Sequence, residues 1–368
     1  MPKAKETVLE INLNALEHNF YFLRSKLKKD TKFLAVVKAF AYGSDAIAVA
    51  KHLEQLQVDY FAVAYTSEGV ALRDAGITTP ILVLHPQKIN FNSLIEHCLE
   101  PSLYNAYILR SFLETAKQHQ QKNYPIHIKF NTGLNRLGFW ENDVDYIIER
   151  LAPADTVRVA SVFSHLAASE DPNEKEFTLN QIATFKKIAG EFSSKIEYRP
   201  LWHQLNTSGI LNYAEVAQFD MVRSGIGLYG FGNDPEYSRQ LKPIATLKSI
   251  ISQIHHIEKG ESVGYNRGYK AADFMKTATI PVGHADGIGR HFGHEKGFVT
   301  INDKKAPILG NVCMDMLMVN ISEVDCREGD EVIVFGAGAS AEILAENAGT
   351  ISYELITGIS QRVKRIFL

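Results

Sequence analysis

The chain has 368 residues, and 39 basic against 42 acidic side chains give a formal net charge of −3. Hydrophobic residues make up 45% of the chain and charged residues 22%, a balance typical of folded globular proteins that excludes wholesale disorder and fibrous structure. The near-neutral charge gives no electrostatic reason to expect binding to nucleic acid or to an anionic membrane surface.

The first ten residues, MPKAKETVLE, contain no long apolar stretch, so no signal peptide is predicted. No window approaches the roughly 18 consecutive apolar residues of a membrane span. Cys98, Cys313 and Cys326 lie far apart, so neither a disulfide framework nor a CxxC metal pair is expected. We therefore expect a cytoplasmic protein with reduced cysteines and no metal site.

The opening segment Thr7–Leu13 is strand-like and precedes a helical segment from Asn14 to about Leu27. From about residue 31 to 230, short apolar runs rich in branched side chains alternate with amphipathic helical segments, such as Asp45–Gln57 and Glu174–Phe192. The runs are Phe33–Val37, Tyr60–Tyr65, Ile81–Leu84, Pro101–Tyr104, Ile126–Phe130, Val159–Phe163, Arg199–Trp202 and Phe219–Val222, of which Pro101–Tyr104 and Arg199–Trp202 are weak.

Strands that alternate with helices indicate right-handed parallel units, and eight of them predict an α/β fold of the (β/α)8 TIM-barrel type. An open doubly wound sheet is the alternative, although no GxGxxG motif follows the first strand. After about residue 240, short runs such as Glu331–Phe335 between turn signals predict a mostly β domain. We expect a barrel over residues 10–240 and a β-rich domain over residues 241–368 that includes the N-terminal strand of residues 1–9.

A barrel carries its chemistry at the C-terminal ends of its strands. Lys38 closes the run FLAVVK, and a lysine that leaves a barrel core is a candidate for a lowered pKa and for Schiff-base chemistry. A lysine that reaches out to solvent is the ordinary alternative. The loops after the seventh and eighth runs offer the hydroxyl of Thr207 and backbone N–H groups near Gly225 and Ile226, as barrel phosphate sites do. Together these features point to pyridoxal 5′-phosphate (PLP), with Arg223 placed to meet its pyridine nitrogen.

The run YPIHIKF predicts a strand with one apolar face and one polar face. Ile126, Ile128 and Phe130 share one face of the predicted strand, and His127 and Lys129 share the other. With the apolar face against the surrounding helices, Lys129 is expected to point into the barrel, where an unpaired ammonium is costly.

Long motifs occur in the order seen in alanine racemases, and the chain resembles that family from Val8 to Phe367. These motifs are VVKAFAYG, KFNTGLNRLGF, HQLNTSG, DMVRSGIGLYG, VGYNRG, IPVGHADGIGR, GNVCMDM and ISYE. The resemblance implies a PLP-dependent racemase of the barrel fold type, active as a homodimer with shared sites.

The resemblance also implies two catalytic bases. Lys38 matches the lysine that carries PLP and acts on one face of the substrate Cα, and Tyr265 matches the base on the opposite face, which the partner subunit supplies. A free tyrosine has a pKa near ~10, so Tyr265 needs help, and His165 and Arg223 resemble the network that tunes it. A cationic guanidinium cannot take up a proton, so Arg223 disfavours a protonated cofactor ring. We therefore expect it to suppress transamination, and Arg223→Glu should increase that side reaction.

Other residues match the family's contacts to cofactor and substrate. Arg136 and the backbone N–H of Met314, the latter from the partner, match contacts to the substrate carboxylate, and Asp315 resembles a supporting residue. Lys129 matches a lysine that is carbamylated in many members, which makes it an anion that orients Arg136. The implied cofactor contacts are Lys38, Tyr42, His165, Asn206, Thr207, Arg223, Gly225, Ile226 and Tyr353.

The expected function is therefore interconversion of L- and D-alanine, supplying D-alanine for peptidoglycan. A broader-specificity or serine racemase of the same fold remains an alternative, since one methylene is worth only ~1–3 kcal/mol of discrimination. A PLP-dependent decarboxylase is disfavoured by the context of Tyr265, and barrel proteins that only carry PLP generally lack a second domain. A barrel glycosidase needs paired carboxylates, and none stands out. Phe40, Ser224 and His284 depart from the family pattern and leave substrate breadth open.

Overall fold

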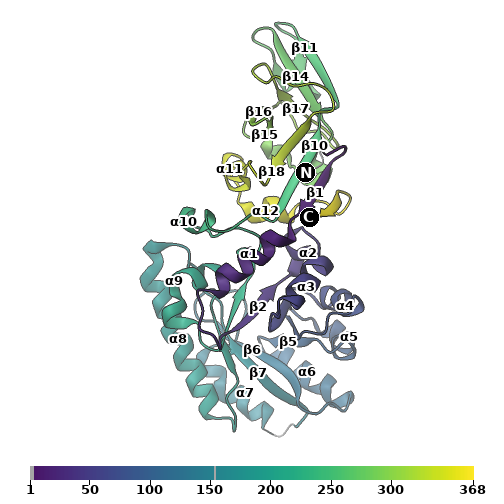
Figure 1. Ribbon diagram of the computed structural model, residues 1–368. Helices are drawn as coiled ribbons and strands as arrows, with labels where there is room; N and C mark the ends of the chain where they lie inside the picture. Colours follow the sequence, from purple (N-terminus) through teal and green to yellow (C-terminus); the bar gives the residue numbers. More distant parts are fainter. Residues whose placement is uncertain (1–3, 153–154) are drawn as a thin grey trace. The chain divides into compact units, whose positions relative to one another are not determined.

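The computed structural model describes residues 4–152 and 155–368 (Figure 1). The described chain forms two compact units. The barrel unit comprises Glu17–Ala41 and Ala46–Lys242, and the β unit comprises Met1–Leu16, Tyr42–Asp45 and Pro243–Leu368. Among the described residues, no helix has the length and apolarity needed to cross a membrane.

Eight parallel strands close the barrel, because the last, β9, pairs with the first, β2. Every run predicted from the sequence is a strand, including the two weak ones, so the doubly wound alternative is wrong. The strands in order around the barrel are β2 (Lys32–Val36), β3 (Tyr60–Val63), β4 (Ile81–Val83), β5 (Glu100–Leu103), β6 (Tyr124–Lys129), β7 (Val157–Phe163), β8 (Leu201–His203) and β9 (Met221–Ser224).

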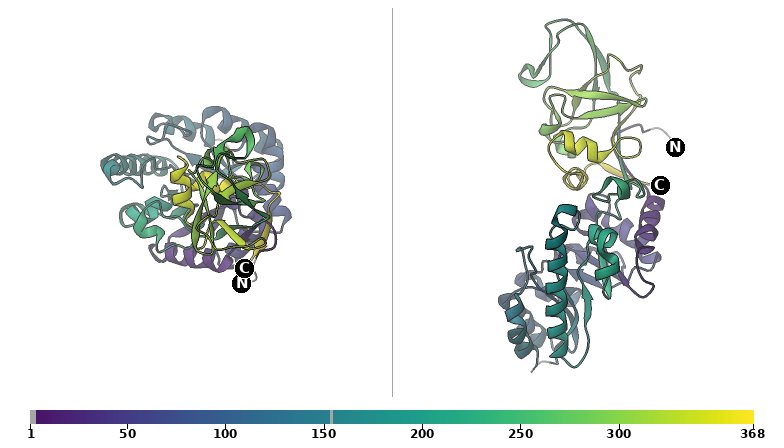
Figure 2. Two further views of the ribbon diagram at one scale, coloured as in Figure 1. Left: turned by 90° about the horizontal axis from the view of Figure 1, so that it is seen from above. Right: turned by 90° about the vertical axis from the view of Figure 1, so that its left-hand side faces the viewer.

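Helices cover the outside of these strands (Figures 1 and 2). Their apolar faces form the packed layer: α8, for example, buries Phe185, Ile188 and Phe192. The helices along the chain are α1 (Leu13–Arg24), α2 (Lys38–Tyr42), α3 (Ala46–Gln55), α4 (Thr66–Asp74), α5 (Phe91–Glu96), α6 (Ala106–Gln118), α7 (Val144–Leu151), α8 (Lys175–Ser194), α9 (Thr207–Ala217) and α10 (Pro235–Ser238).

Helix α1 ends at Arg24, earlier than the predicted Leu27. The Arg24 guanidinium donates to the carbonyls of Lys29 and Thr31, which lie in the connection to β2. These bonds satisfy carbonyl groups of the turn and stabilise it against further helix.

The β unit is built on a nine-stranded sheet with the order β11-β14-β17-β16-β15-β18-β10-β1-β19. The N-terminal strand β1 (Val8–Ile11) lies antiparallel to β10 and parallel to β19. A two-stranded sheet of β12 (Ser262–Val263) and β13 (Tyr269–Lys270) and the helices α11 (Ala341–Asn347) and α12 (Ser352–Thr357) complete this unit. The remaining strands are β10 (Ala245–Ile250), β11 (Gln253–Ile257), β14 (Met275–Ile280), β15 (Phe298–Ile301), β16 (Lys304–Leu309), β17 (Leu317–Asn320), β18 (Glu331–Phe335) and β19 (Lys364–Phe367).

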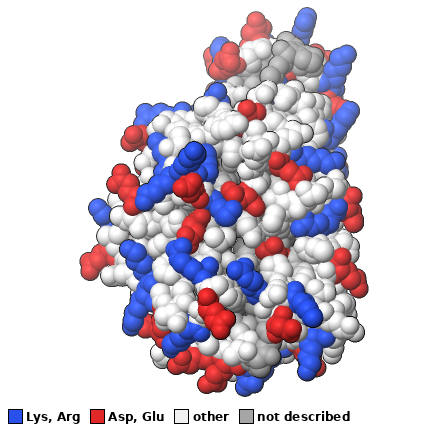
Figure 3. Space-filling model, turned by 60° about the horizontal axis from the view of Figure 1, so that its bottom comes forward, with Lys and Arg blue, Asp and Glu red and all other residues white. Residues whose placement is uncertain are grey.

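Basic and acidic side chains are interspersed over the face drawn in Figure 3. This mixture agrees with the net charge of −3. The long-range field on that face is therefore weak.

Candidate active site

Lys38 begins α2, an unusual left-handed turn directly after β2. Ala39, Phe40, Ala41 and Tyr42 all have φ between 52° and 54°. For residues other than glycine this conformation costs roughly 1–2 kcal/mol each. The surroundings must therefore hold the turn in place.

Glu68, on α4, supplies part of that support. Its Oε1 accepts the backbone N–H of Ala39 at 2.6 Å, and its Oε2 accepts those of Ala64 at 2.7 Å and Tyr65 at 3.0 Å. One carboxylate thus links the turn that carries Lys38 to the end of the neighbouring strand. The sequence analysis missed Glu68, whose only signal was an acid near the start of a helix.

The electrostatics around Lys38 suit a nucleophilic amine. Burial and the positive charge of Arg136 lower the pKa of Lys38, and the carboxylate of Glu68 opposes that shift. A lowered pKa raises the fraction of neutral amine at a given pH, and only the neutral amine attacks a carbonyl.

Arg223, on β9, is 4% exposed and lies at the centre of a polar cluster. It donates to Nδ1 of His203 at 2.6 Å and to Nδ1 of His165 at 3.1 Å. It also donates to the carbonyls of Ser164 at 2.7 Å and Gln204 at 3.0 Å. The structure thus brings together the two residues that the sequence analysis linked, Arg223 and His165, and adds His203.

The charge states of this cluster follow from its burial. Burial lowers the pKa of Arg223 to about 9. Burial and the Arg223 charge hold the pKa values of His165 and His203 well below their usual range. Both imidazoles are therefore neutral near pH 7, as they must be for Nδ1 to accept a hydrogen bond from the Arg223 guanidinium.

Helix α9 begins beside the turn that follows β9. Asn206 caps the helix, because its Oδ1 accepts the N–H of Gly209 at 2.8 Å. The Oγ1 of Thr207 accepts the N–H of Gly227 at 3.2 Å and lies 3.1 Å from the Oγ of Ser224. Ser224, a departure from the family pattern, is therefore part of this hydroxyl cluster.

The same region fits a phosphate group. The backbone hydrogen bonds of the described chain do not use the N–H groups of Gly225 and Ile226 as donors. These two N–H groups and the start of α9 provide the donors that phosphates bind in barrels. A Cβ on Gly227 would lie 2.6 Å from Cγ2 of Thr207, so the turn also requires glycine there.

Lys129, at the end of β6, is 6% exposed. Its Nζ lies 5.8 Å from the ring centre of Phe163, inside the barrel as expected. Burial and the cations Arg136, Arg223 and Lys38 lower the pKa of Lys129 to about 8. All the charges that shift its pKa are positive, so an anion at this position would relieve repulsion.

Tyr265 and Met314 lie in the β unit, where both side chains are exposed, by 74% and 59%. They line an open hollow of about 680 Å³ together with Cys313, Asp315 and Met318. Tyr265 begins the 3₁₀ turn η4 (Tyr265–Arg267), so its ring is held on a short turn rather than on a strand.

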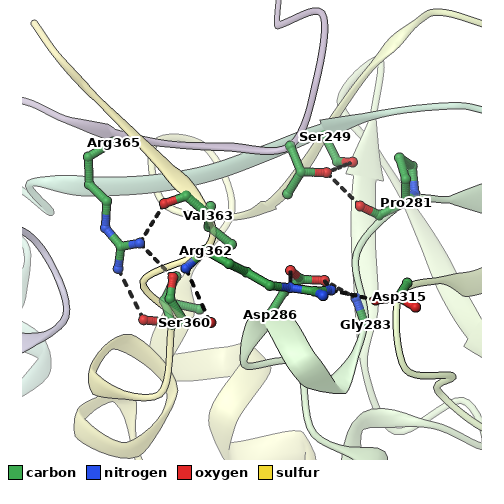
Figure 4. A network of polar contacts seen from close by, with 11 residues as sticks. Ser249, Pro281, Gly283, Asp286, Asp315, Ser360, Arg362, Val363 and Arg365 are labelled. Atoms are coloured by element: carbon green, nitrogen blue, oxygen red, sulfur yellow. Dashed lines mark hydrogen bonds and ion pairs between the residues drawn. The ribbon is translucent and has the colours of Figure 1, made fainter.

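The loop that carries Met314 is anchored by an ion-pair cluster (Figure 4). Arg362 donates to Oδ1 of Asp286 at 2.7 Å, to Oδ2 of Asp286 at 3.1 Å and to Oδ1 of Asp315 at 2.7 Å. The N–H of Ala285, next to Asp286 in η5 (His284–Asp286), donates to the carbonyl of Met314 at 3.0 Å. The sequence did not predict the roles of Arg362 and Asp286, because their ion pair joins segments that lie far apart in the chain.

Tyr42 and Tyr353, two of the implied cofactor contacts, both belong to the β unit. Their ring centres are 6.1 Å apart. Burial and the neighbouring Tyr353 raise the pKa of Tyr42, which keeps its hydroxyl protonated and able to donate.

Comparison with known proteins points to one family over the whole chain. A family model described as "Alanine racemase, N-terminal domain" matches residues 11–233, and one described as "Alanine racemase, C-terminal domain" matches residues 244–367. A curated alanine racemase of Thermodesulfovibrio yellowstonii is 36% identical over 367 residues, covering 98% of this chain and 97% of its own.

Solved structures agree with this result. The alanine racemase of Clostridium difficile 630 superimposes with a TM-score of 0.92 at 34% identity, covering 100% of this chain and 97% of its own. An alanine racemase from Bartonella henselae, whose structure contains covalently bound pyridoxal phosphate, has a TM-score of 0.89 at 27% identity, covering 99% of this chain and 100% of its own.

Proposed function

The chain belongs to the alanine racemase family, and from this premise we propose that it interconverts L- and D-alanine with PLP by a two-base mechanism. We place the cofactor in the barrel of residues 10–240, and we assign to residues 241–368 a contribution to the site of a partner subunit. The observation that carries the proposal is Lys38: an amine of lowered pKa on a left-handed turn, in the same barrel unit as Arg223 and the turn at Gly225 and Ile226, whose backbone N–H groups make no backbone hydrogen bond in the described chain.

The residues of the barrel unit fit PLP. Lys38 would hold its aldehyde carbon, Thr207, Gly225 and Ile226 its phosphate, and Arg223 would donate to its ring nitrogen. The covalently bound pyridoxal phosphate of the Bartonella henselae relative supports this choice of cofactor. PLP supplies the electron sink that makes the α-proton of an amino acid acidic. The family resemblance adds Tyr42, Tyr353, Asn206 and His165 to the cofactor contacts.

The two proton transfers fall to Lys38 and to Tyr265 of the partner subunit. Lys38 would take the Cα proton as a neutral amine, or return it as an ammonium, on one face of the substrate. Tyr265 is 74% exposed on its own chain, which leaves its hydroxyl available to a second copy. The proposed unit is therefore a homodimer, located in the cytoplasm and supplying D-alanine for peptidoglycan.

Arg136 and the backbone N–H of Met314 of the partner subunit would bind the substrate carboxylate. We also propose that Lys129 is carbamylated. A pKa of about 8 leaves part of this amine neutral at pH 7, and only a neutral amine adds CO₂. The resulting anion would lie among three cations and orient Arg136.

Chiral analysis of L-alanine incubated with the protein and PLP tests the activity, with L-serine and L-lysine in parallel for substrate breadth. D-Alanine as the main product supports the proposal. A yellow, PLP-loaded protein that yields no D-alanine contradicts it, and D-serine as the main product favours a serine racemase.

Mixing two inactive variants tests the shared site. Lys38→Ala and Tyr265→Phe should each be inactive alone, and mixing them should restore activity, because one site of the mixed dimer regains both bases. If the mixture stays inactive while mixed dimers form, the two bases do not come from different subunits.

A further inference from the structure

Five neighbouring barrel strands, β5 to β9, each direct one polar side chain into a continuous hydrogen-bonded chain inside the barrel. Oε2 of Glu100 lies 2.7 Å from Nε2 of His127, and Nδ1 of His127 lies 2.6 Å from Oγ of Ser161. The same Oγ lies 2.8 Å from Nε2 of His203, and Nδ1 of His203 lies 2.6 Å from Nη1 of Arg223. His127, Ser161 and His203 are completely buried.

The end at Arg223 sets the direction of every proton in this chain. A guanidinium only donates, so Nδ1 of His203 must accept, and a neutral His203 then carries its proton on Nε2. That proton points at Ser161, whose hydroxyl is free to donate to Nδ1 of His127. The remaining His127 proton lies on Nε2 and points at Glu100. Each link donates away from Arg223 and toward the carboxylate.

An imidazolium at His127 fits less well. Its Nδ1–H and the Nε2–H of His203 would then both point at Ser161 Oγ. The Ser161 hydroxyl makes no other hydrogen bond in the described chain, so its own proton would have no acceptor. The arrangement with two neutral histidines gives a partner to both ring nitrogens of His127 and His203 and to the Ser161 hydroxyl proton.

The buried Arg223 guanidinium has no negatively charged group among its four direct hydrogen-bond acceptors. They are the carbonyls of Ser164 and Gln204 and the ring nitrogens of His165 and His203. A buried cation without a counter-charge is costly. Glu100 supplies a carboxylate at the other end of the chain and also accepts a hydrogen bond from Tyr60.

We propose that Glu100 is a positioning residue for Arg223, acting through His127, Ser161 and His203. Its carboxylate accepts the last N–H of the hydrogen-bonded chain, so that every link from Arg223 onward has an acceptor, and it balances the guanidinium charge inside the barrel. The inference rests on the proposed function, in which Arg223 donates to the cofactor ring.

Nitrogen-15 NMR of histidine-labelled protein tests the chain directly, without and with PLP. Signals are assigned with the variants His127→Gln and His203→Gln. In the wild type we expect both rings to be neutral with the proton on Nε2. In Ser161→Ala we expect the Nε2 signal of His203 to shift, because that N–H loses its acceptor, while Arg223 still fixes the tautomer. A proton on Nδ1 of His203, or a charged His127, overturns the proposal.

Three serine variants distinguish the loss of the hydrogen-bonded chain from a change in core packing. Ser161→Ala interrupts the hydrogen-bonded chain, and Ser161→Thr keeps a hydroxyl at that position. Ser102→Ala removes another completely buried barrel hydroxyl, which has no hydrogen-bond partner among the described residues. We expect Ser161→Ala to lower kcat for alanine about three- to tenfold, the size of one net hydrogen bond. Ser161→Thr should restore it, and Ser102→Ala should leave it unchanged.

Glu100→Gln keeps an acceptor for His127 but removes the charge. We expect a lower kcat and more transamination per turnover, with KM for alanine little changed. If Ser161→Ala and Glu100→Gln leave the histidine nitrogen signals and the turnover as in the wild type, Glu100 does not position Arg223. If the wild type has no racemase activity but shows the expected tautomers, the proposed function fails while the hydrogen-bonded chain stands.

Discussion

At the scale of single residues, Lys129 is the clearest case of a side chain in an unfavourable charge environment. Its ammonium is buried and surrounded by Arg136, Arg223 and Lys38. The folded-state pKa of about 8 lies below the ordinary value of 10.5. Between these values the unfolded chain binds more protons at Lys129 than the folded chain, so this residue's contribution to stability rises with pH.

The variant Lys129→Met removes that penalty. In CO₂-free buffer we expect it to be more stable than the wild type at pH 7, by a margin that shrinks as the pH rises from about 8 to 10.5. Chemical denaturation across this pH range measures the margin. Adding bicarbonate at pH 7 should also reduce it, if carbamylation replaces the cation by an anion. A margin that does not change with pH contradicts the assigned cause.

Gly227 offers a second test at this scale. Gly227→Ala places a Cβ 2.6 Å from Thr207, inside the turn assigned to the phosphate. Overpacking of this size typically costs 1–3 kcal/mol, so we expect PLP affinity to fall roughly tenfold or more. Fluorescence titration of the cofactor-free protein measures it.

Gly190→Ala is the matched control. The added methyl on α8 would lie 3.9 Å from Trp202, which is ordinary contact, and alanine favours helix by about 0.5–1 kcal/mol over glycine. Stability should therefore rise while PLP affinity stays the same. Equal PLP affinity in both variants would show that the turn at Gly227 does not bind the phosphate.

At the scale of elements, the left-handed turn α2 depends on Glu68. Glu68→Gln removes a negative charge that raises the pKa of Lys38, so we expect that pKa to fall further. The pH dependence of Lys38 acylation, followed by peptide mass spectrometry, gives its midpoint. Glu54→Gln is the control, because Glu54 also accepts two backbone N–H groups, those of Thr78 and Thr79. An unchanged Lys38 midpoint in Glu68→Gln contradicts the prediction.

The Arg362 cluster links three segments of the β unit. Arg362→Met frees the loop of Met314, so we expect a severalfold higher KM for alanine with a smaller change in kcat. Lysine cannot replace the planar fork that reaches both Asp286 and Asp315, and Arg362→Lys should restore little. Steady-state kinetics measure both effects. Arg327→Met, which breaks an exposed pair with Asp330, should change neither constant.

How far the sequence predicts these elements depends on the range of the interactions. Strand runs such as Ile81–Leu84 are visible because apolar periodicity is local, and β18 has its predicted bounds, Glu331–Phe335. Nothing in KAFAY signals positive φ, since Ala and Phe rarely adopt it. The role of Glu100 was equally invisible, because it depends on which residues face each other across neighbouring strands.

At the scale of the whole molecule, the chain exposes two residues that we assign to the site of a second copy. Tyr265 and Met314 are both more than half exposed. If a second copy completes the site, specific activity should fall on dilution below the dimer dissociation constant and recover on concentration. Activity assays combined with analytical ultracentrifugation measure this. A fully active monomer contradicts the proposal, and Tyr265→Phe, which should dimerise normally, is the control.

The hydrogen-bonded chain from Glu100 to Arg223 has a consequence for folding. Its members come from five strands spread over more than a hundred positions of sequence, so it can close only after β9 has joined the barrel. An intermediate that lacks β8 and β9 would leave the Ser161 hydroxyl without its His203 partner and the Glu100 carboxylate without the charge of Arg223. The polar links thus favour completion of the barrel in one cooperative step over partly closed forms.

A shift of one residue in any of the five strands would point its polar side chain away from the others. The buried chain therefore serves the folding polypeptide as a check on strand register, in addition to any role in the finished enzyme.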